Sequence, residues 1–294
     1  MTWTDALIRK RGTVTNKRKQ SGSPRLSPRL SAIAAAVSPG CVPADIGTDH
    51  ALLPVSLVLK GSVSRAYACD VGAGPLSRAA AHIRACGLEG RVETRLCDGL
   101  SGLKPGEADC VVIAGMGGEL MVRILSDAET LRSHEGTGFY DTVKEWILSP
   151  HTEHRAVRHY LRTHGLRLVS ERLVEEDHKF YLILKAIPGD GNAPYEASQR
   201  AGFSEEAAEC FGPCLLREPT LVLHRFLTAR LRLLTRAEQV LRCASDPGSG
   251  PGSDPGSQRK KKRAAALSKQ CNLLRELLQK TKAVSGTHMD SENL

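Results

Sequence analysis

The chain has 294 residues, which is enough for one large domain and a smaller additional part. Hydrophobic residues make up 41% and aromatic residues only 4%, so the core must be built mainly from aliphatic side chains. No apolar run approaches the ~20 residues of a membrane span. The nine cysteines are scattered without metal-binding spacing or a secretory signal. These features exclude a membrane-spanning protein and a disulfide-rich secreted one, and we expect free structural thiols, no metal and no membrane partner.

The net charge of +9 is concentrated at the two ends of the chain. Residues 1–30 contain eight Lys/Arg and one acid, and residues 225–282 contain fourteen Lys/Arg and four acids, whereas 31–224 has more acids than bases. Basic extensions gain affinity for polyanions because they release phosphate counterions. The pattern favours a nucleic-acid partner, and the alternative is a tail made basic for solubility.

The predicted elements begin after a basic, nearly acid-free segment at 1–25, which is typical of a disordered arm or a transit peptide. Apolar spacing over 26–38 predicts a helix that leads into the first strand. Strands are then expected at 41–46, 65–69, 91–96, 109–114 and 144–148, with helices at 51–60, 73–86, 117–131 and 153–164. Segments 167–175 and 179–187 read as an antiparallel hairpin. The order predicts an α/β fold with a Rossmann-like, seven-stranded methyltransferase sheet in a domain spanning 26–188.

The C-terminal third predicts helices. A connecting loop is expected at 189–212, because 188–202 are rich in Gly, Pro, Asn and Asp. Leucines at three- and four-residue steps predict a helix over 213–243 and a second over 259–283, joined by a flexible Pro/Gly/Ser linker at 244–258. We expect an antiparallel two-helix coiled coil over 213–283 and a disordered tail at 284–294. A plain structural stalk is the alternative.

Two short runs, residues 45–51 and 113–118, stand at the ends of predicted buried strands. The first contains a single glycine, Gly47, where a dinucleotide site would need G-x-G-x-x-G. S-adenosylmethionine carries positive charge instead of a pyrophosphate, so carboxylates at this turn suit it. Asp45 can organise the turn or hold the ammonium through water, Asp70 can accept the ribose hydroxyls, and Asp98 can accept the adenine amino group. Turn capping is the alternative for Asp45 and Asp98.

The sequence resembles a known family. The motifs are Asp-Ile-Gly-Thr-Asp-His-Ala at 45–51, Gly74-Pro75, Cys-Asp-Gly-Leu at 97–100, Ile-Ala-Gly-Met-Gly-Gly at 113–118 and Glu-Asp-His-Lys-Phe-Tyr at 176–181. Together they are similar to the bacterial-type tRNA (adenine(22)-N1)-methyltransferase family from about 26 to 226. The resemblance implies a class I methyltransferase domain, S-adenosylmethionine as donor, and a helical C-terminal domain that contacts tRNA.

The chain departs from the family at Ser149-Pro150-His151, where the family commonly has Gln-Pro-Asn. The basic N-terminus and the Pro/Gly/Ser linker are additions. They favour a eukaryotic protein that is cytoplasmic or organellar (mitochondrion or plastid) and not secreted, and they leave the exact target nucleotide open.

The expected function is methyl transfer from S-adenosylmethionine to N1 of an unpaired adenine in tRNA, at position 22 by resemblance. N1 lies on the Watson–Crick edge, so the base must be unpaired or flipped. Asp49 is the candidate carboxylate for the cationic methylated base, although it can instead cap the following helix. Alternatives are another RNA base or a non-RNA substrate, and an inactive RNA-binding homologue.

The candidate site residues fall into three groups. Catalytic roles are expected for Asp49, Met116 and Gly117, the last two bordering the target base. Cofactor-binding roles are expected for Asp45, Gly47, His50, Asp70, Asp98, Gly99, Ala114 and Gly115. The basic stretch Arg259, Lys260, Lys261, Lys262 and Arg263 is expected to bind RNA, and the protein is expected to be a monomer with tRNA as its partner.

Overall fold

The computed structural model describes residues 25–130, 138–243 and 255–288. The predicted arm at 1–25 and the tail at 284–294 therefore lie largely outside the described residues, as does most of the linker at 244–258. The eight cysteines whose side chains are described are free thiols.

One seven-stranded sheet organises the catalytic part, in the order β3-β2-β1-β4-β5-β7-β6. Strands β1 to β5 are parallel, and β7 runs antiparallel to both β5 and β6. The bounds are β1 Pro43–Ile46, β2 Ala66–Asp70, β3 Val92–Leu96, β4 Cys110–Ala114, β5 Glu145–Ser149, β6 Leu166–Glu176 and β7 Lys179–Pro188. The predicted fold class is confirmed. Because β1 and β4 are neighbours, the strand order reverses between them, which is where open α/β sheets bind ligands.

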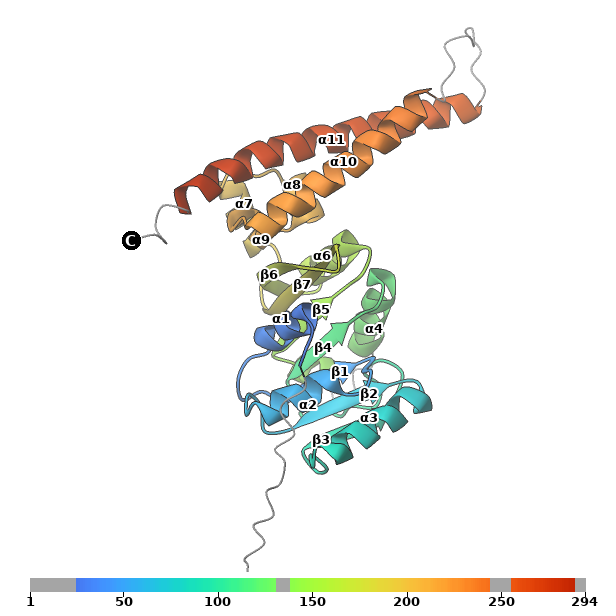
Figure 1. Cartoon of the computed structure of the whole chain (residues 1–294), viewed down its shortest axis with the longest axis vertical. Helices are drawn as coiled ribbons and strands as arrows, with labels where there is room; N and C mark the ends of the chain where they lie inside the picture. Colours follow the sequence, from blue (N-terminus) through green and yellow to red (C-terminus); the bar gives the residue numbers. More distant parts are fainter. Residues whose placement is uncertain (1–24, 131–137, 244–254, 289–294) are drawn as a thin grey trace, which may run out of the picture.

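Helices cover both faces of the sheet (Figure 1). The first face carries α1 Pro28–Ala36, α2 Leu52–Leu59 and α3 Ala73–Ala85; the second carries α4 Gly118–Thr130, α5 Phe139–Thr142 and α6 His154–Thr163. Alternate residues of the central strand β4 point to opposite cores: Val112 packs with the first group and Val111 and Ile113 with the second. Burial on both faces explains why this strand reads as a continuous apolar run.

The prediction of a connecting loop at 189–212 is wrong. This segment forms α7 Ala193–Arg200 and α8 Glu205–Phe211. Pro194 opens α7, and the Ser204 hydroxyl caps α8 by accepting a hydrogen bond from the Ala207 N–H. The helices are short and polar in composition, and they are stabilised by tertiary burial of side chains such as Tyr195 and Ala208.

The helix predicted over 213–243 is divided into α9 Pro213–Arg217 and α10 Leu221–Cys243. The break falls at Glu218, which has φ −126° and ψ 68°, because the proline at 219 disfavours helical backbone in the residue before it. The second helix, α11 Pro255–His288, begins inside the segment predicted as linker and extends past residue 283.

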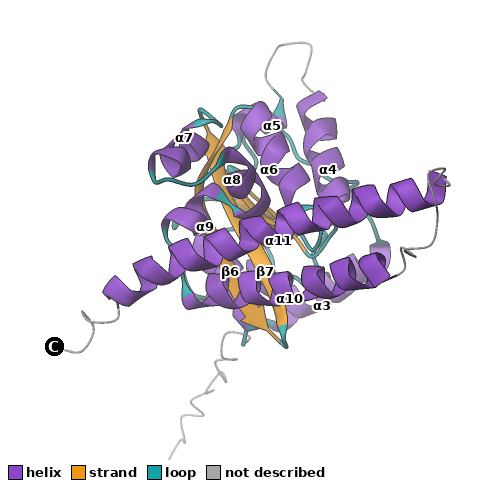
Figure 2. Ribbon diagram, turned by 90° about the horizontal axis from the view of Figure 1, so that it is seen from above, coloured by secondary structure: helices purple, strands orange, loops and turns teal. Residues whose placement is uncertain are grey.

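Helices α10 and α11 run antiparallel, side by side, across the end of the molecule where β6 and β7 lie (Figures 1 and 2). Leu223, Leu227 and Leu234 of α10 are buried, as are Leu274 and Leu277 of α11. Burial of these apolar side chains holds the pair together, as predicted from the leucine spacing.

A buried ion pair connects the helical part to the sheet. The Nε of Arg158 in α6 lies 2.7 Å from Oε1 of Glu171 in β6, with 2% and 0% of the two side chains exposed. The second carboxylate oxygen accepts the N–H of Cys214 in α9 at 2.9 Å, and the guanidinium donates to the Cys210 carbonyl at 3.2 Å. One pair of charges thus joins α6, α8, α9 and the sheet.

Candidate functional site

A cavity of about 320 Å³ lies at the point where the strand order reverses. The turn after β1, the turn after β4, the loop after β5 and helix α1 all contribute to its wall. The lining residues are Arg29, Leu30, Asp45, Gly47, Asp49, Leu52, Leu53, Ala114, Gly115 and His151. Of the predicted cofactor-binding residues, Asp45, Gly47, Ala114 and Gly115 therefore meet around one space, and the predicted catalytic Asp49 joins them.

The turn after β1 favours Gly47 because its φ of +75° is in the left-handed region that glycine adopts readily. A Cβ there would also lie 2.6 Å from the Met116 Cε, so the end of that flexible side chain would have to move. The N–H groups of Gly47 and Thr48 both donate to the Cys69 carbonyl of β2, at 2.9 and 3.0 Å. The turn is therefore fixed to the sheet, with Met116 closing over it.

Asp45 is the half-buried carboxylate at the floor of this cavity. Burial raises its pKa from the ordinary value of 3.8 to about 6. The carboxylate therefore has too little positive charge around it in the protein alone, and a cationic ligand in the cavity would provide it.

Asp70 is the last residue of β2 and Asp98 comes two residues after β3, at the same edge of the sheet but outside the residues that line the cavity. Asp70 Oδ1 accepts the N–H of Gly72 at 2.6 Å, so one of its oxygens organises the turn. Asp98 is exposed, and Gly99 beside it has φ +55°; a Cβ at this position would lie 3.1 Å from Cγ2 of Ile124. The register of β2 against β3 pairs Asp70 with Leu96, so Asp98 lies two residues beyond that pair at the same edge of the sheet.

His50 and Asp49 lie on the surface before α2. The His50 carbonyl oxygen accepts a hydrogen bond from Nδ1 of His82 at 2.6 Å, and the ring lies outside the residues that line the cavity. Asp49 is 71% exposed and pairs with Arg78 at 3.5 Å. The alternative role of Asp49 as the cap of α2 does not hold, because Ala51 occupies the N-cap.

The loops after β4 and β5 are tied together at the mouth of the cavity. The N–H of His151 donates to the Met116 carbonyl at 2.9 Å. A Cβ on Gly117 would lie 3.2 Å from Thr152 Oγ1, and one on Gly118 would lie 2.6 Å from the Thr152 carbonyl. Gly117 was expected to leave room for a flat base. The contacts show that Gly117 and Gly118 are small because the segment after β5 packs directly against them.

Sequence reasoning missed Arg29 and His151. The backbone N–H of Arg29, in the first turn of α1, donates to Glu176 at 2.7 Å, and its guanidinium lies 5.0 Å from the Tyr181 ring. Arg29 Nη1 is 2.7 Å from His151 Nε2. The pKa of His151 is lowered by burial and then by the charges of Arg29 and Lys179. The signal in the sequence was the 176–181 motif, which turns out to position α1.

A second cavity of about 440 Å³ begins at His151 and runs toward the helical part. The loop after β5, α6, α8, α10 and α11 all line it. The lining residues are His151, Thr152, Glu153, His154, Arg155, Glu206, Cys210, Phe211, Phe226, Arg230, Leu234, Gln270 and Leu273. Because His151 lines both spaces, the two cavities are adjacent.

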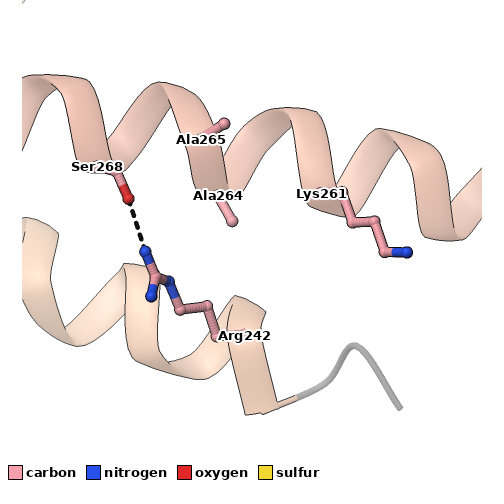
Figure 3. A pocket seen from close by; sticks show the side chains of 5 residues that line it. All are labelled: Arg242, Lys261, Ala264, Ala265 and Ser268. Atoms are coloured by element: carbon pink, nitrogen blue, oxygen red, sulfur yellow. Dashed lines mark hydrogen bonds between the residues drawn. The ribbon is translucent and has the colours of Figure 1, made fainter. Parts of the chain in front are cut away.

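The basic stretch from Arg259 to Arg263 lies in the first turns of α11, and all five residues are exposed. A shallow hollow there is lined by Arg242 of α10 and Lys261 of α11 among others (Figure 3). Arg242 donates to the Ser268 hydroxyl at 2.9 Å, which holds the two helices together beside the basic stretch. The geometry leaves these cations available to an external polyanion.

Two further features concern metal ligands and membrane spans in the described part of the chain. One group of possible metal ligands occurs there, Cys41, Cys110 and Glu145, whose ligand atoms lie within 4.8 Å of one another. The Glu145 carboxylate already pairs with Lys185 at 2.8 Å and accepts the Ser38 hydroxyl at 2.6 Å. Among the described helices, none combines the length and the apolar character needed to cross a membrane.

Comparison with known proteins agrees with this geometry. A family model described as a methyltransferase domain matches residues 26–184. The tRNA (adenine(22)-N(1))-methyltransferase of Bacillus subtilis (strain 168) is 35% identical over 208 residues, which cover 71% of this chain and 82% of that protein.

Solved structures give the same result. The crystal structure of the B. subtilis m1A22 tRNA methyltransferase is 30% identical with a TM-score of 0.72, and the match covers 86% of this chain and 99% of that one. Streptococcus pneumoniae Sp1610 in complex with S-adenosyl-L-methionine is 27% identical with a TM-score of 0.69, covering 86% and 100%. The fold and site define a class I, S-adenosylmethionine-dependent methyltransferase. The chain belongs to the tRNA (adenine(22)-N1)-methyltransferase family.

Proposed function

We propose that this protein transfers a methyl group from S-adenosylmethionine to N1 of an unpaired adenine in tRNA, at position 22. The observation that carries the proposal is the cavity at the point where the strand order reverses. It is lined by Asp45, whose half-buried carboxylate lacks a neighbouring positive charge, and by residues of the motifs at 45–51 and 113–118. The 35% identity to an enzyme named for this reaction supports the same base and position.

The residues around the cavity fit the cofactor. Its volume of about 320 Å³ is within the range of roughly 300–1,000 Å³ that small-molecule sites occupy. Asp45 would receive the ammonium, Asp70 the ribose hydroxyls and Asp98 the adenine amino group. Gly47, Ala114 and Gly115 would let backbone approach the ligand, and the guanidinium of Arg29 offers a partner for the carboxylate of the methionine moiety.

The chemistry needs alignment more than acid–base work. S-adenosylmethionine, when bound, supplies a methyl carbon made electrophilic by its sulfonium. Adenine N1 is unprotonated near neutral pH, so the protein's task is to hold it in line with that carbon and to exclude water. The loops after β4 and β5, joined through Met116 and His151, form the border where the base would enter. Asp49 lies in the same cavity wall and would stabilise the positive charge that methylation leaves on the base.

The test is methyl transfer from labelled S-adenosylmethionine to tRNA transcripts that carry A22. Label in 1-methyladenosine at position 22, and none in a transcript with G22, is the expected result. Label in another base, or only in protein extract, would contradict the proposal. A protein that binds tRNA but transfers no methyl group would favour the inactive homologue.

A further inference from the structure

The second cavity contains two histidines whose hydrogen-bonding roles the structure fixes. His151 Nε2 lies 2.7 Å from the Arg29 guanidinium, which has donors only, so Nε2 must accept. The ring is therefore neutral and carries its proton on Nδ1. His154 Nε2 lies 3.2 Å from the Pro150 carbonyl oxygen, which can only accept, so Nε2 carries a proton. Burial lowers the pKa of His154 to about 4, which leaves Nδ1 as an acceptor.

One ring thus has a spare donor and the other a spare acceptor, and both rings line the same cavity. Adenine presents this complementary pair on its Hoogsteen edge, where N7 accepts and the N6 amino group donates. Guanine presents two acceptors, N7 and O6, on that edge. The acceptor Nδ1 of His154 would then face the acceptor O6, with no proton to form a hydrogen bond. Contact through this edge also leaves N1 free.

We infer that the second cavity holds the adenine to be methylated, and that His151 donates to N7 while His154 accepts from the N6 amino group. The inference rests on the proposed function and deepens it by naming the residues that select the base. Both rings are specificity-determining residues. Because they are neutral, they supply hydrogen bonds without repelling the positive charge that methylation places on the base.

The other walls of the cavity suit a nucleotide. Phe226 of α10 lines it, and its ring is held edge-to-face by Phe180 at a centroid distance of 5.5 Å. An aromatic ring positioned in this way is a stacking surface for an unpaired base. The exposed guanidinium of Arg230, one helical turn further along α10, lies in the same wall and can reach a phosphate.

The position of the cavity agrees with this occupant. His151 lines both this space and the cavity assigned to S-adenosylmethionine, so a base held beside His151 lies next to the methyl donor. The cavity also extends to α10 and α11, the helices that carry the exposed basic residues at their far end. An RNA strand bound to those helices would therefore reach the active site through this cavity.

The first experiment tests the proposed hydrogen bond between His151 and adenine N7 by changing each of the two groups in turn. A tRNA with a single 7-deazaadenosine at the methylated position is compared with the unmodified tRNA. Loss of one neutral hydrogen bond should lower kcat/KM about three- to tenfold in the wild type. Replacing N7 by carbon makes N1 more basic, so lower reactivity cannot explain that loss. His151→Phe should be equally slow on both tRNAs, and His151→Asn, which restores a donor, should recover the discrimination.

The second experiment tests His154 and the stacking wall by binding, because removal of the amino group also weakens N1 as a nucleophile. Wild type should bind tRNA carrying purine riboside at the target position about three- to tenfold more weakly than the unmodified tRNA. His154→Phe should not distinguish them. Phe226→Leu should reduce the fluorescence quenching of 2-aminopurine at that position, whereas Val240→Ala, on the exposed face of α10, should not.

The outcomes separate the two proposals. If the wild type does not methylate the unmodified tRNA, the proposed function fails. If it does, but treats the 7-deazaadenosine and purine-riboside tRNAs like the unmodified one, the assignment of both histidines is overturned. Melting curves of the variants distinguish a lost contact from a lost fold, and the atom-substituted RNAs give the same answer with an unaltered protein.

Discussion

Burial of Asp45 disfavours the charged form of its carboxyl group. Its raised pKa means that it takes up a proton as the pH falls through about 6. A protonated Asp45 no longer attracts a cation, so S-adenosylmethionine affinity should decrease from pH 7 to pH 5, by up to about tenfold per unit below the pKa. Calorimetric titration across this range measures the effect. Asp45→Asn should bind weakly with little pH dependence, and an unchanged dependence in that variant would refute the assignment.

The same residue links the site to stability. The folded protein binds the Asp45 proton more tightly than the unfolded chain does, so this contribution is complete below about pH 3.8 and is lost as the pH rises through 6. Above pH 6 the ionised carboxylate therefore costs stability. Asp45→Asn should raise the free energy of unfolding by roughly 1–3 kcal/mol at pH 7.5, as measured by urea denaturation. A less stable variant would show that the carboxylate is well compensated by the protein.

Asp49 tests the chemical step. It lies in the cavity wall but is largely exposed, and the ion pair with Arg78 is long. Since its proposed role is toward charge that develops on the base, Asp49→Ala should lower kcat much more than it weakens S-adenosylmethionine binding. Arg78→Ala is the matched control: it removes one of the two partners of the carboxylate, the other being His50 at 3.4 Å, and keeps the carboxylate itself. If cofactor affinity falls in step with kcat, Asp49 belongs to the cofactor site.

At the level of elements, the buried Arg158–Glu171 pair links the sheet to helices α8 and α9. Arg158→Met would leave a buried carboxylate without its countercharge, which typically costs about 3–5 kcal/mol. Urea denaturation should show this loss. Arg200→Met removes an exposed pair with Glu196 and should cost less than about 1 kcal/mol. Equal effects of the two substitutions would show that the buried pair does not connect these elements.

The strands were easier to predict from the sequence than the short helices and the contacts between distant residues. Strands β1 to β5 were predicted to within two residues. The signal was clearest for β2 and β4, whose apolar runs are continuous and stop at Asp70 and just before Gly115. Helices α7 and α8 were missed because they depend on tertiary burial of a few side chains. Parallel topology brings strand ends together, and for this reason Asp45, Gly47 and Gly115 were expected at one site and do line one cavity, whereas Asp70 and Asp98 lie outside its lining. Arg29 and His151 are far apart in sequence, and no local pattern indicated that they would meet.

At the scale of the whole molecule, we propose that the acidic catalytic part binds the target base and that the basic helices bind the RNA phosphates. Deleting α11 would test this poorly, because it would uncover Leu223, Leu227 and Leu234 on α10. Neutralising exposed charge leaves that packing intact. The basic residues at the start of α11 are suitable, since their side chains point into solvent and the helix is held further along by Cys271, Leu274 and Leu277.

Replacing Lys260–Lys262 by glutamine should therefore raise the KM for tRNA and leave S-adenosylmethionine binding and the melting temperature unchanged. If these side chains neutralise phosphates, the slope of log K against log salt should become less steep by about two. The matched control replaces Lys60, Arg65 and Lys104, which are equally exposed but lie near the amino ends of the strands, away from the cavities. Phosphate contacts position the RNA without reading its sequence, so methylation should stay at the same adenine. An unaltered salt slope, or an equal effect of the control, would show that α11 serves the fold and that tRNA is held elsewhere.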